Sequence, residues 1–177
     1  MTPLRQTPDH SRGVLEVDWP LFGELSRALA LKVARAYDPQ VVVGIATAGV
    51  IPGATIASIL QRDFHSILVS RRYASASARE SPSIMGAAPA EVRNQRVLLV
   101  DETCDSGATM RLAVAAIVNA GADDVRTAVG FRTGTYAPDF AGLETESTII
   151  LPWDREVLIA GELVLKPEYA KILKRGE

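Results

Sequence analysis

The chain has 177 residues, of which 47% are hydrophobic, and its formal net charge is −2. This length and this apolar content indicate one globular domain with a sizeable core, and they exclude a disordered chain. The balanced charge gives no electrostatic case for nucleic acid as a partner, and no apolar run approaches the roughly 20 residues that a membrane-spanning helix needs.

Cysteine and histidine are scarce, with one cysteine, Cys104, and two histidines, His10 and His65. A single cysteine excludes an internal disulfide, and this set offers no zinc-ligand spacing. The polar N-terminus also lacks the apolar core of a signal peptide. We therefore expect a cytoplasmic protein that has neither a membrane nor a nucleic acid as its partner.

The first part of the chain combines a polar arm with alternating helix and strand patterns. Asp18 before Pro20 is a typical helix opening, and leucines at helical spacing continue that helix to about Asp38. A short uninterrupted apolar run, such as Val41–Ile45, indicates a strand buried on both faces. The expected elements are a loose arm over residues 1–13, a helix over 18–38, a strand over 41–45, an alanine-rich helix over 50–60 and a strand over 65–69.

The second part continues the alternation after an irregular segment. Residues 73–91 are small, polar and punctuated by proline and glycine, which predicts a long mobile loop. Further strands are expected over 97–100, 125–131 and 148–151, with a helix over 108–120. Strands that alternate with helices form βαβ units, so we predict an α/β fold with a mostly parallel sheet of five strands.

The stretch VLLVDETCDSGATM, residues 97–110, carries the clearest chemical signal. Ligands of parallel sheets bind at the carboxyl ends of the strands, where Asp101 and Glu102 are expected. Two adjacent acids there are costly unless hydroxyl donors or a metal ion offset their repulsion. The residues that follow sit where a helix begins, and a helix start offers unpaired N–H groups to a phosphate. These residues are Ser106, Gly107, Ala108 and Thr109.

This combination describes a ligand with two neighbouring hydroxyl groups close to one phosphate, which is a ribose 5-phosphate. Simpler interpretations exist for each residue taken alone: Asp101 and Glu102 would form a solvated strand end, and Ser106 or Thr109 would cap the helix. The whole stretch resembles the phosphoribosyl-pyrophosphate signature of the type I phosphoribosyltransferase family, and the resemblance extends from about Val17 to Trp153. It implies that the two acids hold the ribose hydroxyls and that residues 105–109 cradle the 5-phosphate.

The same resemblance assigns a pyrophosphate site to two further segments. Thr47, Ala48 and Gly49 match the pyrophosphate loop of the family, for which a plain strand–helix turn is the alternative, and a non-proline cis peptide is expected near Thr47–Ala48. Arg71 and Arg72 would pair with pyrophosphate, although a solvated arginine pair is an equally ordinary interpretation. Tyr73 and the loop after it would close over the site and exclude water.

The base-binding residues follow from likeness to the xanthine-guanine and hypoxanthine branch of the family. Asp105 would exchange a proton with a 6-oxopurine, and its alternative is a helix cap. Arg132 would contact the 6-oxo group and Ile149 would lie against the base. Residues 147–177 would form a small C-terminal hood and extension, in which Trp153 is expected to pack in the core.

We therefore expect an enzyme that transfers the phosphoribosyl group from phosphoribosyl pyrophosphate to a purine base, works as a homodimer and uses Mg²⁺. The ion would be bound indirectly, through the sugar pyrophosphate, beside Asp101 and Glu102. Two alternatives stay open. One is a non-catalytic regulatory protein of the same fold that senses phosphoribosyl pyrophosphate, and the other is an enzyme of the same family that uses a different base.

Overall fold

The computed structural model describes residues 13–72 and 78–173, and the chain divides into two compact units. The sheet unit comprises residues 24–145. The terminal unit combines the chain up to Gly23 with the chain from Glu146. The expected single domain, with a loose arm over 1–13 and a hood over 147–177, stays a prediction; residues 1–12 and 174–177 lie outside the described residues.

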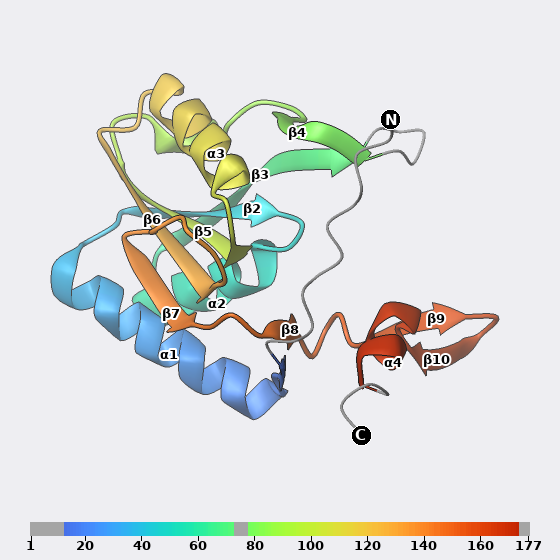
Figure 1. The fold of residues 1–177 in the computed structure, drawn as a ribbon. Helices are drawn as coiled ribbons and strands as arrows, with labels where there is room; N and C mark the ends of the chain where they lie inside the picture. The colour runs from blue at the N-terminus through green and yellow to red at the C-terminus, as the bar shows by residue number, and fades with distance from the viewer. Residues whose placement is uncertain (1–12, 73–77, 174–177) are drawn as a thin grey trace. The chain divides into compact units, whose positions relative to one another are not determined.

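Helices and strands alternate along most of the described chain (Figure 1). In order they are β1 (Val14–Glu16), α1 (Trp19–Ala36), β2 (Val41–Ala46), α2 (Val50–Leu60), β3 (Asp63–Arg72), β4 (Ala78–Ile84), the 3₁₀ helix η2 (Ala90–Val92), β5 (Arg96–Cys104), α3 (Ala108–Asn119), β6 (Asp124–Arg132), β7 (Phe140–Glu144), β8 (Thr148–Ile150), β9 (Glu156–Ile159), β10 (Glu162–Leu165) and α4 (Pro167–Leu173).

The central sheet of the sheet unit has six strands in the order β4-β3-β2-β5-β6-β7. Four neighbouring pairs are parallel: β3 with β2, β2 with β5, β5 with β6, and β6 with β7. The edge strand β4 runs antiparallel to β3. The α/β fold with a mostly parallel sheet is therefore confirmed, and the carboxyl ends of its parallel strands lie at one edge.

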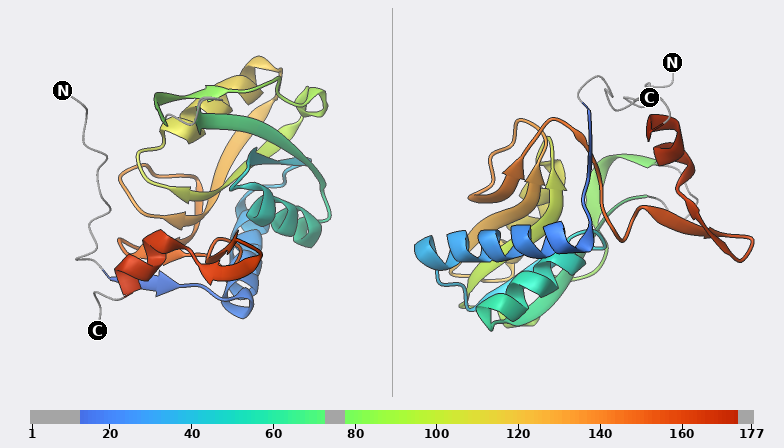
Figure 2. Two further views of the ribbon diagram at one scale, coloured as in Figure 1. Left: turned by 90° about the vertical axis from the view of Figure 1, so that its right-hand side faces the viewer. Right: turned by 90° about the horizontal axis from the view of Figure 1, so that it is seen from below.

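Helices cover both faces of this sheet, with α3 on the opposite face from α1 and α2 (Figures 1 and 2). Because side chains alternate along a strand, each buried strand supplies both cores. On one face the core joins Leu29, Val33 and Ile56 to Val42 and Leu98. On the other it joins Met110, Ala113 and Ile117 to Val43 and Leu99. Among the described residues, no helix combines the length and the apolar character needed to cross a bilayer.

The strand prediction was wrong in several places, and the short strands β1, β9 and β10 of the terminal unit were also not expected. Residues 78–84 form β4, within the segment expected to be a loop over 73–91; residues 73–77 lie outside the described residues. β7 was not expected at all. Residues 148–150 do form a strand, but β8 pairs with β1 in a separate two-stranded sheet, so the central sheet has six strands of different membership from the expected five.

Three aromatic rings pack against one another in the terminal unit. The ring of Trp153 lies 5.8 Å from that of Trp19 and 4.8 Å from that of Phe22, centroid to centroid. The packing role expected for Trp153 is thus seen within this unit. Nearby in sequence, the Lys166 ammonium donates to both carboxylate oxygens of Asp154 at 2.8 and 3.0 Å, which fixes the segment before the short helix α4.

Candidate functional site

A cavity of about 370 Å³ opens at the carboxyl ends of β2 and β5. Two connections form most of its wall: the turn between β2 and α2, and the loop between β5 and α3. The lining residues are 45–48, 101 and 103–110, together with Val69 of β3. The sheet therefore brings two segments, separated by more than fifty residues in the sequence, to a single hollow at the edge where parallel sheets bind ligands.

Most of the predicted site residues in the sheet unit line this cavity. Thr47 and Ala48 come from the first connection, and both are exposed. From β5 and the second connection come Asp101, Asp105, Ser106, Gly107, Ala108 and Thr109. That these two connections would share one site was expected from the resemblance to the family, because neither segment by itself indicates the other. The geometry of this site places the carboxylates of Asp101 and Asp105, several hydroxyl groups and a helix start around one space.

β5 runs on past the apolar residues that were expected to end it, and it includes Asp101 and Glu102. Successive side chains of a strand point to opposite faces, and the cavity is accordingly lined by Asp101 and Thr103 but not by the half-buried Glu102. The Asp101 carboxylate accepts the Glu102 N–H at 2.8 Å. Asp101 therefore lines the cavity and Glu102 does not, whereas the sequence had led us to expect both acids at the ribose hydroxyls.

The loop between β5 and α3 is shaped by Gly107, which precedes the helix and has a φ of 74°. This left-handed conformation is strained for a residue with a Cβ. The Ala108 N–H lies 3.5 Å from the Ser106 hydroxyl oxygen. The N-cap residue of α3 is Gly107, which has no side chain to accept a hydrogen bond from the first turn. The first turn of α3 consequently presents N–H groups and the positive end of its dipole beside the cavity.

The turn between β2 and α2 holds a cis peptide bond between Ala46 and Thr47, one bond before the expected position. Gly49 follows the exposed part of this turn and is buried. A Cβ at Gly49 would lie 2.5 Å from the Val100 carbonyl oxygen, so only glycine allows the turn to approach β5 this closely. Gly49 thus shapes the wall of the cavity, and it is not among the described residues that line it.

The remaining predicted residues lie elsewhere or are only partly described. Arg132 ends β6, donates to the Glu144 carboxylate at 3.1 Å and does not line the cavity. Ile149 belongs to the terminal unit, where it pairs with Leu15 of β1. The backbone of Arg71 and Arg72 ends β3, whereas Tyr73 lies outside the described residues. Their roles remain predictions.

No role in the site was expected from the sequence for Thr103 or for Cys104, yet both line the cavity. Strand alternation from Asp101 would have identified Thr103 had the strand been extended far enough. Cys104 is 5% exposed, and burial, together with the negative charge of Asp101, raises the pKa of its thiol. A raised pKa favours the protonated thiol, which is a weaker nucleophile than the thiolate.

A resident metal centre has no ready ligand set in the described part of the chain. No group of three or more His, Cys, Asp or Glu residues is placed there to hold an ion. The cavity does contain carboxylate oxygens, from Asp101 and Asp105, which suit Mg²⁺ as single ligands. Such an ion would need most of its ligands from a bound phosphate compound or from water.

Comparison with known proteins gives matches that span most of the chain. The profile of the phosphoribosyl transferase domain matches residues 17–156. A xanthine-guanine phosphoribosyltransferase of Nitratidesulfovibrio vulgaris is 24% identical over 164 residues, which cover 92% of this chain and 98% of that protein. The structure of a purine phosphoribosyltransferase from Pyrococcus horikoshii superposes with a TM-score of 0.71 at 26% identity, over 82% of this chain and 97% of that one.

A further solved structure shares the fold over nearly the whole chain. It is a hypothetical protein from Neisseria gonorrhoeae with bound ppGpp, which superposes with a TM-score of 0.69 at 19% identity, over 94% of this chain and 98% of that one. At this identity the likeness concerns the fold alone.

Proposed function

Because the chain belongs to the phosphoribosyl transferase domain family, whose enzymes are glycosyltransferases, we propose that it transfers the phosphoribosyl group of phosphoribosyl pyrophosphate to a 6-oxopurine and releases pyrophosphate. The purine acceptor is supported by the names of two relatives, the Nitratidesulfovibrio vulgaris and Pyrococcus horikoshii enzymes. The preference for a 6-oxopurine rests on the first of these names and on an acid at position 105.

One observation carries the proposal: Asp101 and the start of α3 face the same cavity. A sugar phosphate needs hydrogen-bond acceptors for its hydroxyls and donors for its phosphate. Asp101 supplies the first, while the N–H groups and hydroxyls of residues 106–109 supply the second. Thr47 and Ala48, across the cavity, would receive the pyrophosphate through their backbone, and Arg71 and Arg72 would add charge to that end.

The reaction is a displacement at the first carbon of the ribose. A nitrogen of the base attacks that carbon and pyrophosphate leaves, so positive charge builds up on the sugar. The displacement needs no covalent intermediate with the protein, because the base itself is the nucleophile. The residues act by holding the two substrates in line and by placing carboxylate charge near the developing cation. Tyr73 would help to exclude water.

Asp105 is proposed as the residue that exchanges a proton with the purine ring. It lines the cavity and is exposed, and its carboxylate lies beside Gly134. A carboxylate within hydrogen-bond reach of the ring nitrogen could take up or return the proton as the new bond forms. Arg132 and Ile149 are proposed to contact the 6-oxo group and the face of the base. Glu102 is proposed to help Asp101 at the ribose hydroxyls.

Mg²⁺ fits this cavity as an ion that arrives with the substrate. It would be held by pyrophosphate and ribose oxygens, with the Asp101 carboxylate beside it, and it would neutralise charge on the leaving group. Because its ligands would come mainly from the substrate, we expect apparent Mg²⁺ affinity to rise when phosphoribosyl pyrophosphate is present.

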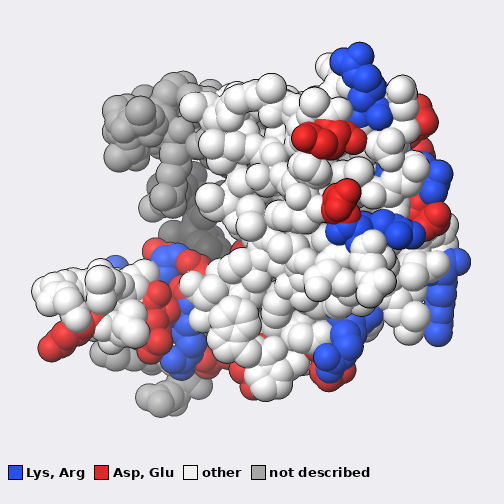
Figure 3. All heavy atoms as spheres, turned by 180° about the vertical axis from the view of Figure 1, so that it is seen from behind, with Lys and Arg blue, Asp and Glu red and all other residues white. Residues whose placement is uncertain are grey.

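We also propose a homodimer formed through the outer face of α2 and β3. The eleven residues of α2 include no charged side chain, and Figure 3 shows few charges over this face. Ile59, Leu68 and Met85 are apolar side chains left 43%, 43% and 45% exposed there. Uncharged apolar surface of this kind marks an interaction site. Sedimentation of Ile59→Glu against wild type tests the face: the variant should sediment as a monomer, and an unchanged dimer would refute it.

The transfer itself is tested by measuring pyrophosphate release with phosphoribosyl pyrophosphate, Mg²⁺ and one base at a time: hypoxanthine, guanine, xanthine, adenine and orotate. The proposal predicts turnover with at least one of the first three bases and little or none with orotate. Tight binding of the sugar pyrophosphate without turnover of any base would instead favour a sensor protein, and turnover confined to adenine or orotate would overturn the choice of base.

A further inference from the structure

Three successive carbonyl groups of the loop between β5 and α3 accept hydrogen bonds from groups outside the lining of the cavity. The Thr133 N–H donates to the Cys104 carbonyl at 2.9 Å, and the Tyr136 N–H donates to the Asp105 carbonyl at 3.0 Å. The Arg111 guanidinium donates to the Ser106 carbonyl at 2.7 Å. We call Thr133, Tyr136 and Arg111 the outer brace. Two of them come from the connection between β6 and β7, which lies beside this loop (Figure 1).

Fixing these carbonyls also fixes the N–H groups of the loop. In a trans peptide unit the C=O and the following N–H point in opposite directions. Among the described residues only the Ala46–Thr47 bond is cis, so the loop peptides are trans. The carbonyls of residues 104–106 are bound to the brace, and the N–H groups of residues 105–107 therefore turn away from it. All three of those residues line the cavity.

The contact between the brace and the loop leaves no spare room. A Cβ at Gly107 would lie 2.2 Å from Cδ2 of the Tyr136 ring, so the ring rests directly on the glycine backbone. A Cβ at Gly134, within the same connection, would come within 1.9 Å of the Asp105 carboxylate. Both glycines are required by this close approach. The loop thus has the brace on one side and the cavity on the other, and it can move only by displacing the brace or by entering the cavity.

Arg111 is held on two sides. Its guanidinium carbon lies 5.3 Å from the centroid of the Tyr136 ring, within the range of a cation–π contact, while one of its nitrogens binds the Ser106 carbonyl. Arg111 itself is not among the described residues that line the cavity. Its contacts are with the loop and with the Tyr136 ring, so we assign it the role of supporting the loop.

We propose that the outer brace is a positioning device for the sugar phosphate: it holds the loop so that the N–H groups of Asp105 and Ser106 are ready for the 5-phosphate before the ligand arrives. This inference rests on the proposed function. Preorganised donors bind more tightly because the ligand need not order the loop. The hydrogen bonds that define the brace all go to the loop between β5 and α3, so its effect should fall on the sugar phosphate and spare pyrophosphate.

The test compares the binding of ribose 5-phosphate with the binding of inorganic pyrophosphate, measured by calorimetry on the full chain. Arg111→Ala and Tyr136→Ala should each weaken ribose 5-phosphate binding about tenfold, the size expected for losing one charge-assisted hydrogen bond or its support. Pyrophosphate binding should stay within about twofold of wild type, since the brace donates its hydrogen bonds to the other loop. In turnover, the KM for phosphoribosyl pyrophosphate should rise while kcat at saturation stays nearly constant.

Conservative variants separate positioning from charge and from simple loss of structure. Tyr136→Phe keeps the ring and should restore most of the affinity. Arg111→Lys keeps the charge but loses the planar group, and should stay intermediate. Arg27→Ala, which removes an exposed arginine paired with Glu24 on α1, is the matched control and should bind like wild type.

Each outcome has a distinct meaning. If wild type does not bind ribose 5-phosphate at millimolar concentration, the proposed function fails. If wild type binds it and the alanine variants bind equally well, only the brace is wrong. Equal weakening of ribose 5-phosphate and pyrophosphate refutes the brace in favour of a general structural role. If Arg111→Lys binds ribose 5-phosphate as tightly as wild type, and if the loss of affinity in Arg111→Ala disappears at high salt, then Arg111 acts through its charge at a distance and the positioning role is refuted.

Discussion

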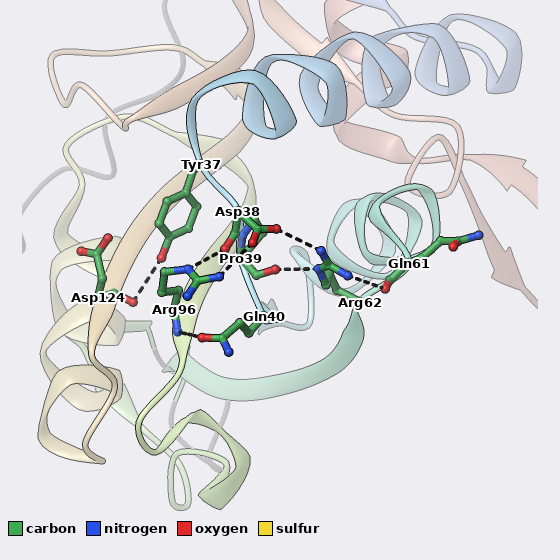
Figure 4. A network of polar contacts seen from close by, with 8 residues as sticks. All are labelled: Tyr37, Asp38, Pro39, Gln40, Gln61, Arg62, Arg96 and Asp124. Carbon is green, nitrogen blue, oxygen red and sulfur yellow. Dashed lines mark hydrogen bonds and ion pairs between the residues drawn. The ribbon is translucent and has the colours of Figure 1, made fainter.

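The two ends of the central sheet use polar residues in opposite ways. At the carboxyl end, carboxylates, hydroxyls and the start of α3 surround a cavity. At the amino end, where β2, β3, β5 and β6 begin, polar side chains bind one another and the backbone (Figure 4). Asp38 accepts from Arg62 at 2.9 Å and from Arg96 at 2.9 Å, and Arg62 also donates to the Pro39 carbonyl at 2.7 Å.

The difference separates stability from function. At the amino end these side chains bind one another and the backbone, so their contacts join the strand starts to each other. The hydrogen bond from Arg62, followed by the charges of both arginines, holds the pKa of Asp38 below its usual range. At the carboxyl end, donors and acceptors are arranged around a space. We expect substitutions at the amino end to change the free energy of unfolding, and substitutions at the carboxyl end to change ligand binding and turnover.

The largest expected effect is that of Asp105→Asn, at the carboxyl end. The amide cannot exchange a proton with the purine, so turnover should fall on the order of a hundredfold or more, as for loss of a general acid–base group. Ribose 5-phosphate binding and the melting temperature should change little. Pyrophosphate release at saturating substrates and calorimetric binding measure the two effects. A proportional loss of both would show that Asp105 acts in binding and not in proton exchange.

A pair of glycine substitutions compares the two ends of α3. Gly107 begins the helix at the cavity and Gly121 follows it at the amino edge of the sheet, and both have positive φ, 74° and 99°. Either change to alanine should cost about 1–2 kcal/mol in unfolding free energy, because a Cβ is strained there. Only Gly107→Ala should also weaken ribose 5-phosphate binding, by tenfold or more, since its Cβ would push the loop from Tyr136. If Gly107→Ala and Gly121→Ala bound ribose 5-phosphate equally well, the proposed difference between the two ends of α3 would be wrong.

Tyr37→Phe should affect stability alone. The Tyr37 hydroxyl lies 3.3 Å from both the Val97 and the Asp124 carbonyl oxygens, and its loss should cost about 1 kcal/mol in unfolding free energy, with kcat and KM unchanged. Burial, and next the charge of Asp124, raise the pKa of Tyr37 to about 12 from 10.0. The folded state therefore keeps this proton longer than the unfolded state, and the stabilisation is present below pH 10 and lost as the pH rises towards 12.

Denaturant titrations at pH 8 and pH 11 test this prediction. The difference between wild type and Tyr37→Phe in unfolding free energy should be smaller at pH 11. If Tyr37→Phe lost activity while its stability stayed unchanged, Tyr37 would act in function, and the assignment of the amino end to stability would be wrong.

The smallest effect is expected for Asp139→Asn, at the start of β7. Burial acts to raise the pKa of this carboxylate, but hydrogen bonds from the Thr127 N–H and hydroxyl, each 2.8 Å, and from Arg126 lower it on balance. A lowered pKa in the folded state adds stability above the ordinary value of 3.8, and this stability is lost as the pH falls below it. The variant should therefore show a flatter acid limb in melting temperature between pH 5 and pH 2, whereas Asp123→Asn, an exposed control, should follow wild type.

The sequence predicted the parts of the fold that local patterns encode. The helices over α1, α2 and α3, and the buried apolar strands β2 and β5, follow from spacing and from apolar runs. β4 was missed because it contains Ser81, Pro82 and Ser83, a composition typical of loops; proline is tolerated there because β4 is an edge strand. The pairing of β8 with β1 joins residues more than 130 positions apart, and no local pattern specifies such a partner.

The same limit applies to the candidate site. Residues 101–109 could be predicted because carboxylates, glycine and hydroxyls stand in order before a helix. The outer brace could not, because Tyr136 and Gly134 reach the loop across the sheet from a connection whose sequence has no motif of its own. Likewise, Asp101 and Glu102 are adjacent in sequence, and only the extension of β5 separates their positions relative to the cavity.

The most direct test is a titration of isotopically labelled wild-type protein with ribose 5-phosphate, followed through backbone amide resonances. The account predicts saturable shifts that are largest at residues 105–109, with a smaller change at Asp101 and little change at the amino end around Asp38 and Arg96. The absence of saturable shifts at millimolar ligand, or shifts centred away from the loop between β5 and α3, would contradict it.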